Sequence, residues 1–295
     1  MPESYSLEVD ETLKERNAHG SFELPIETYS DNCYIFHALY SHWHDEMELI
    51  YIEQGSGFAR LNKKSLRLKP GYLLIINSGV LHSMKTDLQN ILYYKSVVFH
   101  PDFLSGSTGD RFQERVITPL LENRVEIAHL ITQKDARYAR IVSLFTQIYN
   151  CYREQDTYYY VKLKALLFDF FYEMLAGHHL IPADLNQHKN VTVMKQVFDY
   201  IGTHYAEPLS VGELTALSNY SENYFMKLFK QYTGKTLISY INDFRLERAK
   251  PLLLHTDMPI TEIALQVGFN STSYFIKKFQ EANGISPHKY RKIIS

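Results

Sequence analysis

Residues that are able to bind a metal ion or a polar ligand recur at short spacing in the segment 42–48, HWHDEME. Residues two apart in a β-strand share a face, so His42, His44 and Glu48 are predicted to point together into the fold. His82 is expected to join them from a neighbouring strand. Such a cluster has three possible roles. It binds a metal ion such as Fe, Mn, Ni or Zn, it orients an organic molecule, or its members hydrogen-bond to one another.

Short strands are the elements expected to hold these residues. Aromatic and β-branched side chains are concentrated in five runs, at 35–40, 46–54, 58–61, 66–68 and 72–76. Turn-forming residues such as Gly55-Ser56-Gly57 and Pro70-Gly71 separate these runs. Regular short strands of this kind predict a small β-barrel or sandwich.

Two helices are predicted after this β-rich region, at about 136–180. In the first, apolar residues recur every three or four positions from Ile141 to Tyr152. The second is apolar on two faces, and needs two packing partners. One face carries Val161, Ala165, Phe168, Tyr172 and Leu175, and the other carries Leu163, Leu167, Phe170 and Met174. We therefore expect a homodimer through this helix, with burial inside one chain as the alternative.

The C-terminal third contains an internal repeat. The segment 221–234, SENYFMKLFKQYTG, matches 271–284, STSYFIKKFQEANG, at a constant offset of 50 residues. Each copy begins with a serine suited to a helix N-cap and ends at a glycine suited to the position after the helix. A shorter predicted helix precedes each copy, at 211–218 and 260–267. Two helices joined by a tight turn, found twice, predict a tandem helix-turn-helix.

In a helix-turn-helix the second helix enters the major groove of DNA. The helix faces opposite the repeated phenylalanines are therefore predicted to contact double-stranded DNA. The predicted DNA-binding residues are Glu222, Asn223, Met226, Lys227 and Lys230 in the first copy and Thr272, Ser273, Ile276, Lys277 and Gln280 in the second. A helix predicted at about 237–254 would link the two units over about 27 Å, close to the 34 Å of one turn of B-DNA. A helical hairpin repeat with a solvated face is the alternative.

Residues 191–295 resemble the DNA-binding domain of the AraC/XylS family of bacterial transcription regulators. The resemblance is carried by ITEIALQVGFNSTSYF at 260–275 and by Phe279, Gly284, Ser286-Pro287, Tyr290-Arg291 and the linking-helix segment 245–253. Two positions depart from the family pattern. Thr215 stands where the family usually has alanine, and Pro251 lies inside the linking helix, where it removes a backbone hydrogen bond and favours a kink.

The first part of the chain resembles the cupin family. Its first motif, HxHxxxE followed by glycine, matches 42–55, and its second matches 71–82 with Asn77 where proline is usual. Cupin-like barrels are the usual sensor domain of AraC-type sugar regulators, so the resemblance implies a small effector, a sugar or sugar derivative. The predicted effector-binding residues are His42, Trp43, His44, Glu48, His82, Tyr94 and Ser96. Trp43 would add the aromatic face that a sugar favours.

The resemblance to cupins leaves a second interpretation open. In it the protein is a metal-dependent cupin enzyme, or a metal-sensing cupin, fused to a DNA-binding domain. Its metal ligands would be His42, His44, Glu48 and His82. The effector interpretation is preferred, and no cofactor is predicted.

Composition and charge agree with two folded domains. The chain has 295 residues, of which 45% are hydrophobic and 22% charged, as is usual for globular proteins. Residues 1–190 carry 19 Lys and Arg against 24 Asp and Glu, whereas 191–295 carry 12 against 9. The basic balance thus coincides with the predicted DNA-binding region. Cys33 and Cys151 lie far apart, which argues against a disulfide framework or a zinc finger.

The sequence therefore predicts an α+β protein. A cupin-like β-barrel and helical pair at 1–180 precede a linker at 181–190 and an all-α tandem helix-turn-helix domain at 191–295. No secretion signal or membrane-spanning run is recognised, so the expected location is the cytoplasm, with no membrane partner. No catalytic arrangement is found either, so an enzyme is not expected. The expected partners are double-stranded DNA, the effector, a second copy of the chain and, for a transcriptional activator, RNA polymerase.

Overall fold

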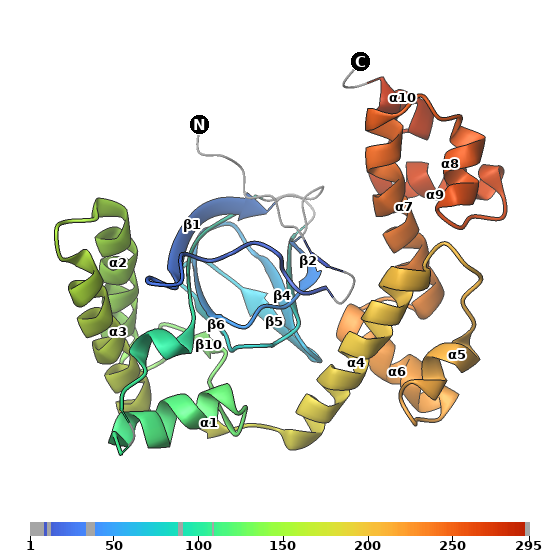
Figure 1. Ribbon diagram of the computed structural model, residues 1–295. Helices are drawn as coiled ribbons and strands as arrows, with labels where there is room; N and C mark the ends of the chain where they lie inside the picture. The colour runs from blue at the N-terminus through green and yellow to red at the C-terminus, as the bar shows by residue number, and fades with distance from the viewer. Residues whose placement is uncertain (1–8, 11–12, 34–38, 88–90, 108, 293–295) are drawn as a thin grey trace. The chain divides into compact units, whose positions relative to one another are not determined.

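The computed structural model describes residues 9–10, 13–33, 39–87, 91–107 and 109–292. The chain divides into two compact units, which consist mainly of Lys14–Val191 and Thr192–Ser295. The first unit contains the strands and the second contains helices alone among its described residues (Figure 1). The predicted α+β class is thereby confirmed.

Two antiparallel sheets form the first unit. Its strands are β1 (Ile26–Cys33), β2 (Leu39–His42), β3 (Met47–Gln54), β4 (Gly57–Leu61), β5 (Lys64–Leu68), β6 (Leu73–Ile76), β7 (His82–Thr86), β8 (Leu92–Phe99), β9 (Val125–Ile127), β10 (Leu130–Ile131) and β11 (Leu180–Pro182). The larger sheet has the order β1-β8-β3-β6-β10 and the smaller has the order β2-β7-β4-β5, while β11 pairs with β9.

Successive side chains of β3 point to opposite faces of the larger sheet, and both faces are covered. Ile50 and Ile52 belong to the core between the two sheets, together with Met84 of β7. Met47 and Leu49 belong to a second core on the outer side of the larger sheet. The two sheets thus enclose an interior of their own, and the predicted barrel is present (Figure 1).

Helices of the first unit cover the outer side of the larger sheet. They comprise a 3-10 turn at Pro101–Leu104, a π-helical turn at Gln113–Ile117, α1 (Thr118–Leu121), α2 (Tyr138–Glu154) and α3 (Tyr159–Ala176). Phe145 of α2 and Phe171 of α3 are buried against this sheet. The two helices predicted at about 136–180 are confirmed.

The second unit is a tandem helix-turn-helix. Its helices are α4 (Leu185–His204), α5 (Val211–Ala216), α6 (Glu222–Thr233), α7 (Leu237–His255), α8 (Ile260–Gln266), α9 (Thr272–Asn283) and α10 (Pro287–Arg291). The predicted caps of the repeat are in place. Ser221 accepts from the N–H of Tyr224 and Ser271 from that of Tyr274. Gly234 and Gly284 end the helices with φ of 74° and 73°, a conformation that glycine adopts without steric cost.

The phenylalanines of the repeat form the cores that hold each pair of helices. Phe225 and Phe229 of α6 are fully buried, and Phe229 packs against the ring of Phe198. Phe275 and Phe279 of α9 are buried in the same way beside α7 and α8. The helix α7 continues past Pro251 to His255.

The segment 181–190 differs from the predicted irregular linker. Strand β11 extends to Pro182 and pairs with β9, and α4 begins at Leu185. The boundary between the two units falls at Val191–Thr192, inside α4. The local sequence of β11 has no strand pattern. Its strand conformation is due to hydrogen bonding with β9, which lies more than 50 residues earlier in the chain.

Candidate functional site

The predicted histidine cluster forms inside the barrel, although its residues do not share one strand. His42 is the last residue of β2, His44 lies in the connection that follows, and Glu48 is the second residue of β3. His82 begins β7 and is the cross-strand partner of His42. The expectation that 42–48 is one strand is thus wrong, because a bend at Asp45-Glu46 separates β2 from β3. The side chains nevertheless converge.

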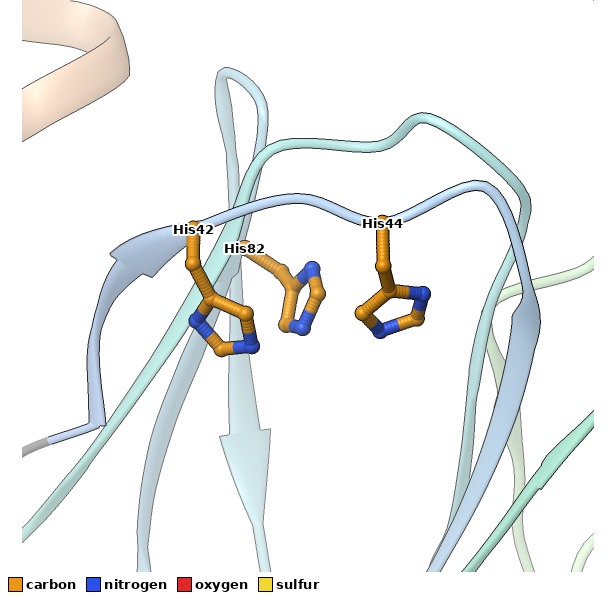
Figure 2. A group of neighbouring side chains, drawn as sticks. All are labelled: His42, His44 and His82. Carbon is orange, nitrogen blue, oxygen red and sulfur yellow. The ribbon is translucent and has the colours of Figure 1, made fainter. Parts of the chain in front are cut away.

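Figure 2 shows the three imidazole rings side by side on neighbouring segments of backbone. The ring centroids of His42 and His82 are 4.0 Å apart, those of His44 and His82 are 5.0 Å apart, and those of His42 and His44 are 6.0 Å apart. One nitrogen from each ring lies within 4.8 Å of the other two. All three side chains are buried.

The N-terminal segment adds further groups to this pocket, which sequence reasoning did not identify. Glu15, His19 and Tyr29 line the same cavity. The Glu15 carboxylate lies 3.3 Å from Nε2 of His19 and 3.8 Å from Nε2 of His42. Residues 14–25 contain no regular strand or helix, so no periodic signal in the sequence could have placed them here.

Two of the remaining predicted effector-binding residues line the pocket and one does not. Tyr94 and Ser96 are buried in β8 and face the cavity, as strand alternation predicts. Trp43 is absent from the lining and lies with its ring 5.1 Å from the ammonium group of Lys14. Trp43 sits between two histidines whose side chains point inward, so alternation along the extended chain directs its own side chain to the opposite side.

Hydrogen bonds to the backbone fix the orientation of two of the rings. Nδ1 of His44 donates to the carbonyl of Glu46 at 3.0 Å, and Nδ1 of His82 donates to that of Val80 at 2.9 Å. A carbonyl oxygen only accepts, so the proton of each neutral ring is on Nδ1 and the lone pair is on Nε2. Both Nε2 atoms lie 3.6 Å from the same carboxylate oxygen of Glu48.

Burial and neighbouring charges shift the pKa values of the cluster in different directions. Burial lowers the pKa of His82 well below its usual value, and the adjacent His42 and His44 lower it further. For His44, burial also opposes the charged form, but the Glu48 carboxylate outweighs it and raises the pKa. The pKa of Glu48 is lowered, because contacts with His44 and the other imidazoles outweigh the effect of burial. The pocket thus favours a carboxylate beside at least one neutral imidazole.

The cavity between these side chains is small. The space open to the centre of a water molecule measures about 20 Å³, which is room for little more than one water molecule. A ligand of the size of a metal ion therefore fits as the pocket stands, whereas a larger molecule requires its lining to move.

The predicted DNA-binding residues lie on the outer faces of α6 and α9. Glu222, Asn223, Lys227 and Lys230 are exposed on α6, and Met226 is half-buried. On α9 the exposed residues are Ser273, Ile276, Lys277 and Gln280, while Thr272 is half-buried. The same helices bury their phenylalanines, so each presents one free face. This arrangement is suited to insertion into a DNA groove.

One face of α3 is left exposed by the described residues of the first unit. Val161, Phe168 and Tyr172 are 57%, 43% and 60% exposed, and Ala165 between them is also exposed. The opposite face, with Leu163, Leu167, Phe170 and Met174, is fully buried. In the described part of the chain, no helix is both long enough and apolar enough to cross a membrane.

Comparisons with known proteins agree with both units. Residues 24–171, half of the chain, match the family model of the AraC-like ligand binding domain, and residues 214–293 match that of the helix-turn-helix domain. The chain is 27% identical over 290 residues to the uncharacterized HTH-type transcriptional regulator YdeC of Bacillus subtilis, covering 97% of this chain and 98% of that protein.

Two further relatives match about a third of the chain. The regulatory protein PocR of Salmonella typhimurium is 36% identical over 102 residues, which cover 35% of this chain and 34% of PocR. The C-terminal domain of the two-component response regulator yesN from Fusobacterium nucleatum is 33% identical and covers 34% of this chain and 98% of that structure, with a TM-score of 0.32. The ligand-binding domain stands first and the helix-turn-helix domain second, and the chain belongs to the AraC family of DNA-binding transcription regulators.

Proposed function

We propose that this regulator is a cytoplasmic homodimer whose DNA binding responds to a small polar effector, a sugar or sugar derivative, held in the histidine-lined pocket. The observation that supports it best is the enclosed polar cavity in the barrel of a chain that also presents two helix faces suited to DNA. Hydroxyl groups need donors and acceptors in a fixed arrangement, and the pocket supplies them through histidines, Glu48, Tyr94 and Ser96. In the role of activator the protein would also contact RNA polymerase.

A sugar is larger than the cavity of about 20 Å³, so its binding requires part of the lining to move. The segment that carries Glu15 and His19 is the part most able to do so. Glu15 is held to the barrel by the contact of its carboxylate with His42 and by one backbone hydrogen bond to the carbonyl of Trp43 at 2.9 Å, without a regular strand, and loops are in general more mobile than the strands they cover. Effector binding would thus be coupled to the position of the N-terminal segment.

The exposed face of α3 supports the homodimer. Side chains such as Phe168 and Tyr172 are too large and apolar to be left in water without cause when they form one continuous stripe. A second copy of the same stripe around a two-fold axis would cover it. Two copies would then place two tandem units on repeated half-sites of the operator.

Lys227 and Lys277 are expected to contribute to DNA binding. If either lysine meets a phosphate, Lys→Ala should weaken binding to all sequences and reduce the salt slope by about 1. If it meets a base, the change should cost about 1–3 kcal/mol on the cognate site and relax specificity there. Affinity is measured by fluorescence anisotropy at several salt concentrations, on duplexes selected from a random library by the wild-type protein.

Lys134→Ala serves as the matched control, because Lys134 is an exposed lysine of the first unit. Its affinity and salt slope should equal those of the wild-type protein. Wild-type behaviour of both Lys227→Ala and Lys277→Ala would contradict the assignment of α6 and α9 as the reading helices.

Glu48→Gln should weaken effector binding. The substitution keeps the shape of the side chain but replaces a charged acceptor by a neutral one, and charge-assisted hydrogen bonds are about twice as strong. A loss of about 1.4 kcal/mol of binding free energy corresponds to a tenfold weaker affinity for the effector. A thermal-shift screen of carbohydrates identifies the effector first, since a ligand at 100 times its Kd adds about 2.7 kcal/mol of stability. Calorimetry on EDTA-treated protein then measures the affinity.

Glu53→Gln is the control for this experiment. Glu53 lies on the same strand but pairs with Lys95 outside the pocket, so its replacement should leave effector affinity unchanged. A sugar that binds equally well to the wild-type, Glu48→Gln, His44→Ala and His82→Ala proteins would show that the effector site lies elsewhere.

A further inference from the structure

We propose that the side-chain amide of Asn77 couples the sensor pocket to the DNA-binding unit. Asn77 stands where the cupin pattern usually has proline, and its side chain does not line the pocket. Its role is that of a positioning residue, which transmits a change in the pocket to α4 through hydrogen bonds of the backbone. This coupling rests on the proposed function, because it requires that the pocket controls DNA binding, and it adds the physical connection between the two.

The amide of Asn77 takes the place of a strand beside β9. Its Nδ2 donates to the carbonyl of Ile127 at 2.9 Å, and its Oδ1 accepts from the N–H of Ile127 at 2.8 Å. The N–H groups of successive strand residues face opposite edges of the strand. The N–H of Ala128 accordingly donates to the carbonyl of His179, just before β11, at 2.8 Å. Strand β9 is thus held by β11 at one edge and by a single side chain at the other.

The two hydrogen bonds between Asn77 and Ile127, termed the amide clamp, are closed to water. Asn77 is 6% exposed and Ile127 is fully buried. Without the amide, the N–H and C=O of Ile127 would lose these partners, and unpaired buried groups of the backbone are unfavourable. The clamp has two discrete states, bonded and released. A two-state element of this kind is what energetic coupling between distant sites requires.

The turn that follows β6 ties the amide clamp to the pocket. The N–H of Gly79 donates to the carbonyl of His44 at 2.8 Å, and the N–H of Val80 donates to the carbonyl of Asn77 at 3.2 Å. Nδ1 of His82 donates to the carbonyl of Val80 at 2.9 Å. Two of the pocket histidines are therefore bonded to the turn that begins with Asn77.

An occupant of the pocket would act on this turn through His82 and Glu48. Nε2 of His82 is buried and has no hydrogen-bond partner in the described structure, so it is available to a hydroxyl group. A ring that turns to make this bond pulls on the carbonyl of Val80 through its other nitrogen. Glu48 is the cross-strand partner of Ile76, the residue before Asn77. Movement of either side chain thus reaches the backbone beside the clamp.

Strand β9 passes such a movement to the helix that enters the DNA-binding unit. It pairs with β11 along its whole length. The N–H of Ala183 donates to the carbonyl of Arg124 at 3.0 Å. The carboxylate of Asp184 accepts from the N–H of Asn186, in the first turn of α4, at 3.0 Å. The connection between β11 and α4 is therefore short and hydrogen-bonded at both ends.

Helix α4 extends this connection to a reading helix. It is one continuous helix from Leu185 to His204, and the boundary between the two units lies within it. In the second unit, the ring centroid of Phe198 in α4 lies 5.8 Å from that of Phe229 in α6. A change at the start of α4 therefore has a packed route to the helix that presents Lys227.

The test perturbs the pocket without an effector. Ser96 lines the cavity and is 1% exposed, so Ser96→Leu fills the space of about 20 Å³ as an occupant would. The wild-type protein, Ser96→Leu, Asn77→Ala and the double variant are compared as full chains, by fluorescence anisotropy on the duplexes selected by the wild-type protein. Ser96→Leu alone should change DNA affinity within the range of about 5–150-fold that coupled sites show. In the Asn77→Ala background it should change affinity less than about twofold.

Hydrogen exchange followed by mass spectrometry reports the clamp itself. Backbone amides in 125–128 and 180–191 should exchange about tenfold faster in Asn77→Ala than in the wild-type protein. Ser96→Leu should raise the same rates, and the double variant should show no further increase. Asn77→Asp keeps the shape and the acceptor of the side chain but loses the donor, so its response should be intermediate. Thermal unfolding of each variant establishes that the barrel is folded.

Asn62→Gly is the matched control for the loss of a buried amide. Asn62 is 3% exposed, but its Oδ1 accepts from the N–H of Leu81 rather than from β9. Its φ of 51° suits glycine. The substitution should lower the stability of the barrel and leave the response of DNA affinity to Ser96→Leu unchanged, which separates coupling from a merely structural role.

An equal response to Ser96→Leu with and without Asn77 would overturn the coupling, as would the absence of any response in the wild-type background. A sugar from the carbohydrate screen that alters DNA affinity equally in the wild-type and Asn77→Ala proteins would also overturn it, but would leave the proposed function intact. Conversely, a screen that yields no sugar, together with a response that depends on Asn77, would overturn the sugar alone.

Discussion

Phe275→Ala should destabilise the second helix-turn-helix unit by about 3–5 kcal/mol, the usual cost of truncating a buried aromatic side chain. Phe275 is fully buried, and its ring centroid lies 5.3 Å from that of Phe269 and 5.8 Å from that of Phe279. Alanine would remove these contacts and leave a cavity beside α7 and α8. Because domains are stable by only about 5–15 kcal/mol in total, a large part of the unit's stability would be lost.

Urea unfolding of the full chain, followed by circular dichroism, measures this change. The helical transition of the second unit should move to lower urea, and DNA binding should fall with it. Ile276→Ala is the matched control, because Ile276 is the next residue of α9 and is 36% exposed. Its free energy of unfolding should change by less than about 0.5 kcal/mol. Its DNA affinity should nevertheless change if Ile276 contacts a base. An unshifted midpoint for Phe275→Ala would disprove the role of this core.

Tyr172→Glu should abolish the proposed dimer while leaving each chain folded. Tyr172 is 60% exposed in the single chain, so a carboxylate there remains solvated and costs the monomer little. In a two-fold interface the same carboxylate would be buried against its own copy, and an unpaired buried charge is strongly unfavourable. Phe168→Glu should act in the same direction, with an added cost because the Phe168 ring also contacts Phe112.

Light scattering after size-exclusion chromatography measures the loss of the dimer. Affinity for DNA with two half-sites should fall by about 10²–10⁴-fold, since linked binding sites lose their effective concentration when the link is broken. Gln147→Glu is the control, because it adds the same charge at an exposed position of α2 away from the stripe. A monomeric wild-type protein would refute the dimer, and global unfolding of Tyr172→Glu would favour a partner within the chain.

The helix-turn-helix repeat was determined by the sequence because its signals are local. A serine N-cap acts over three residues, as Ser221 does on Tyr224, and paired phenylalanines four apart mark the buried side of one helix. Each of these interactions lies within one or two helical turns. The copy at an offset of 50 residues then repeated the same information. Pro251 lies inside α7, which continues past it to His255.

The pocket, in contrast, was decided by the tertiary structure. The pairing of His42 with His82 depends on the register of β2 against β7, which a sequence specifies through the whole sheet rather than at one residue. Glu15 and His19 reach the same cavity from an irregular segment that has no periodic pattern. Trp43 was misplaced because it was assigned to the pocket together with its neighbours His42 and His44, whereas successive side chains of an extended segment point to opposite sides. Residue types predicted the chemistry of the barrel, but contacts between distant segments decided which side chains share the cavity.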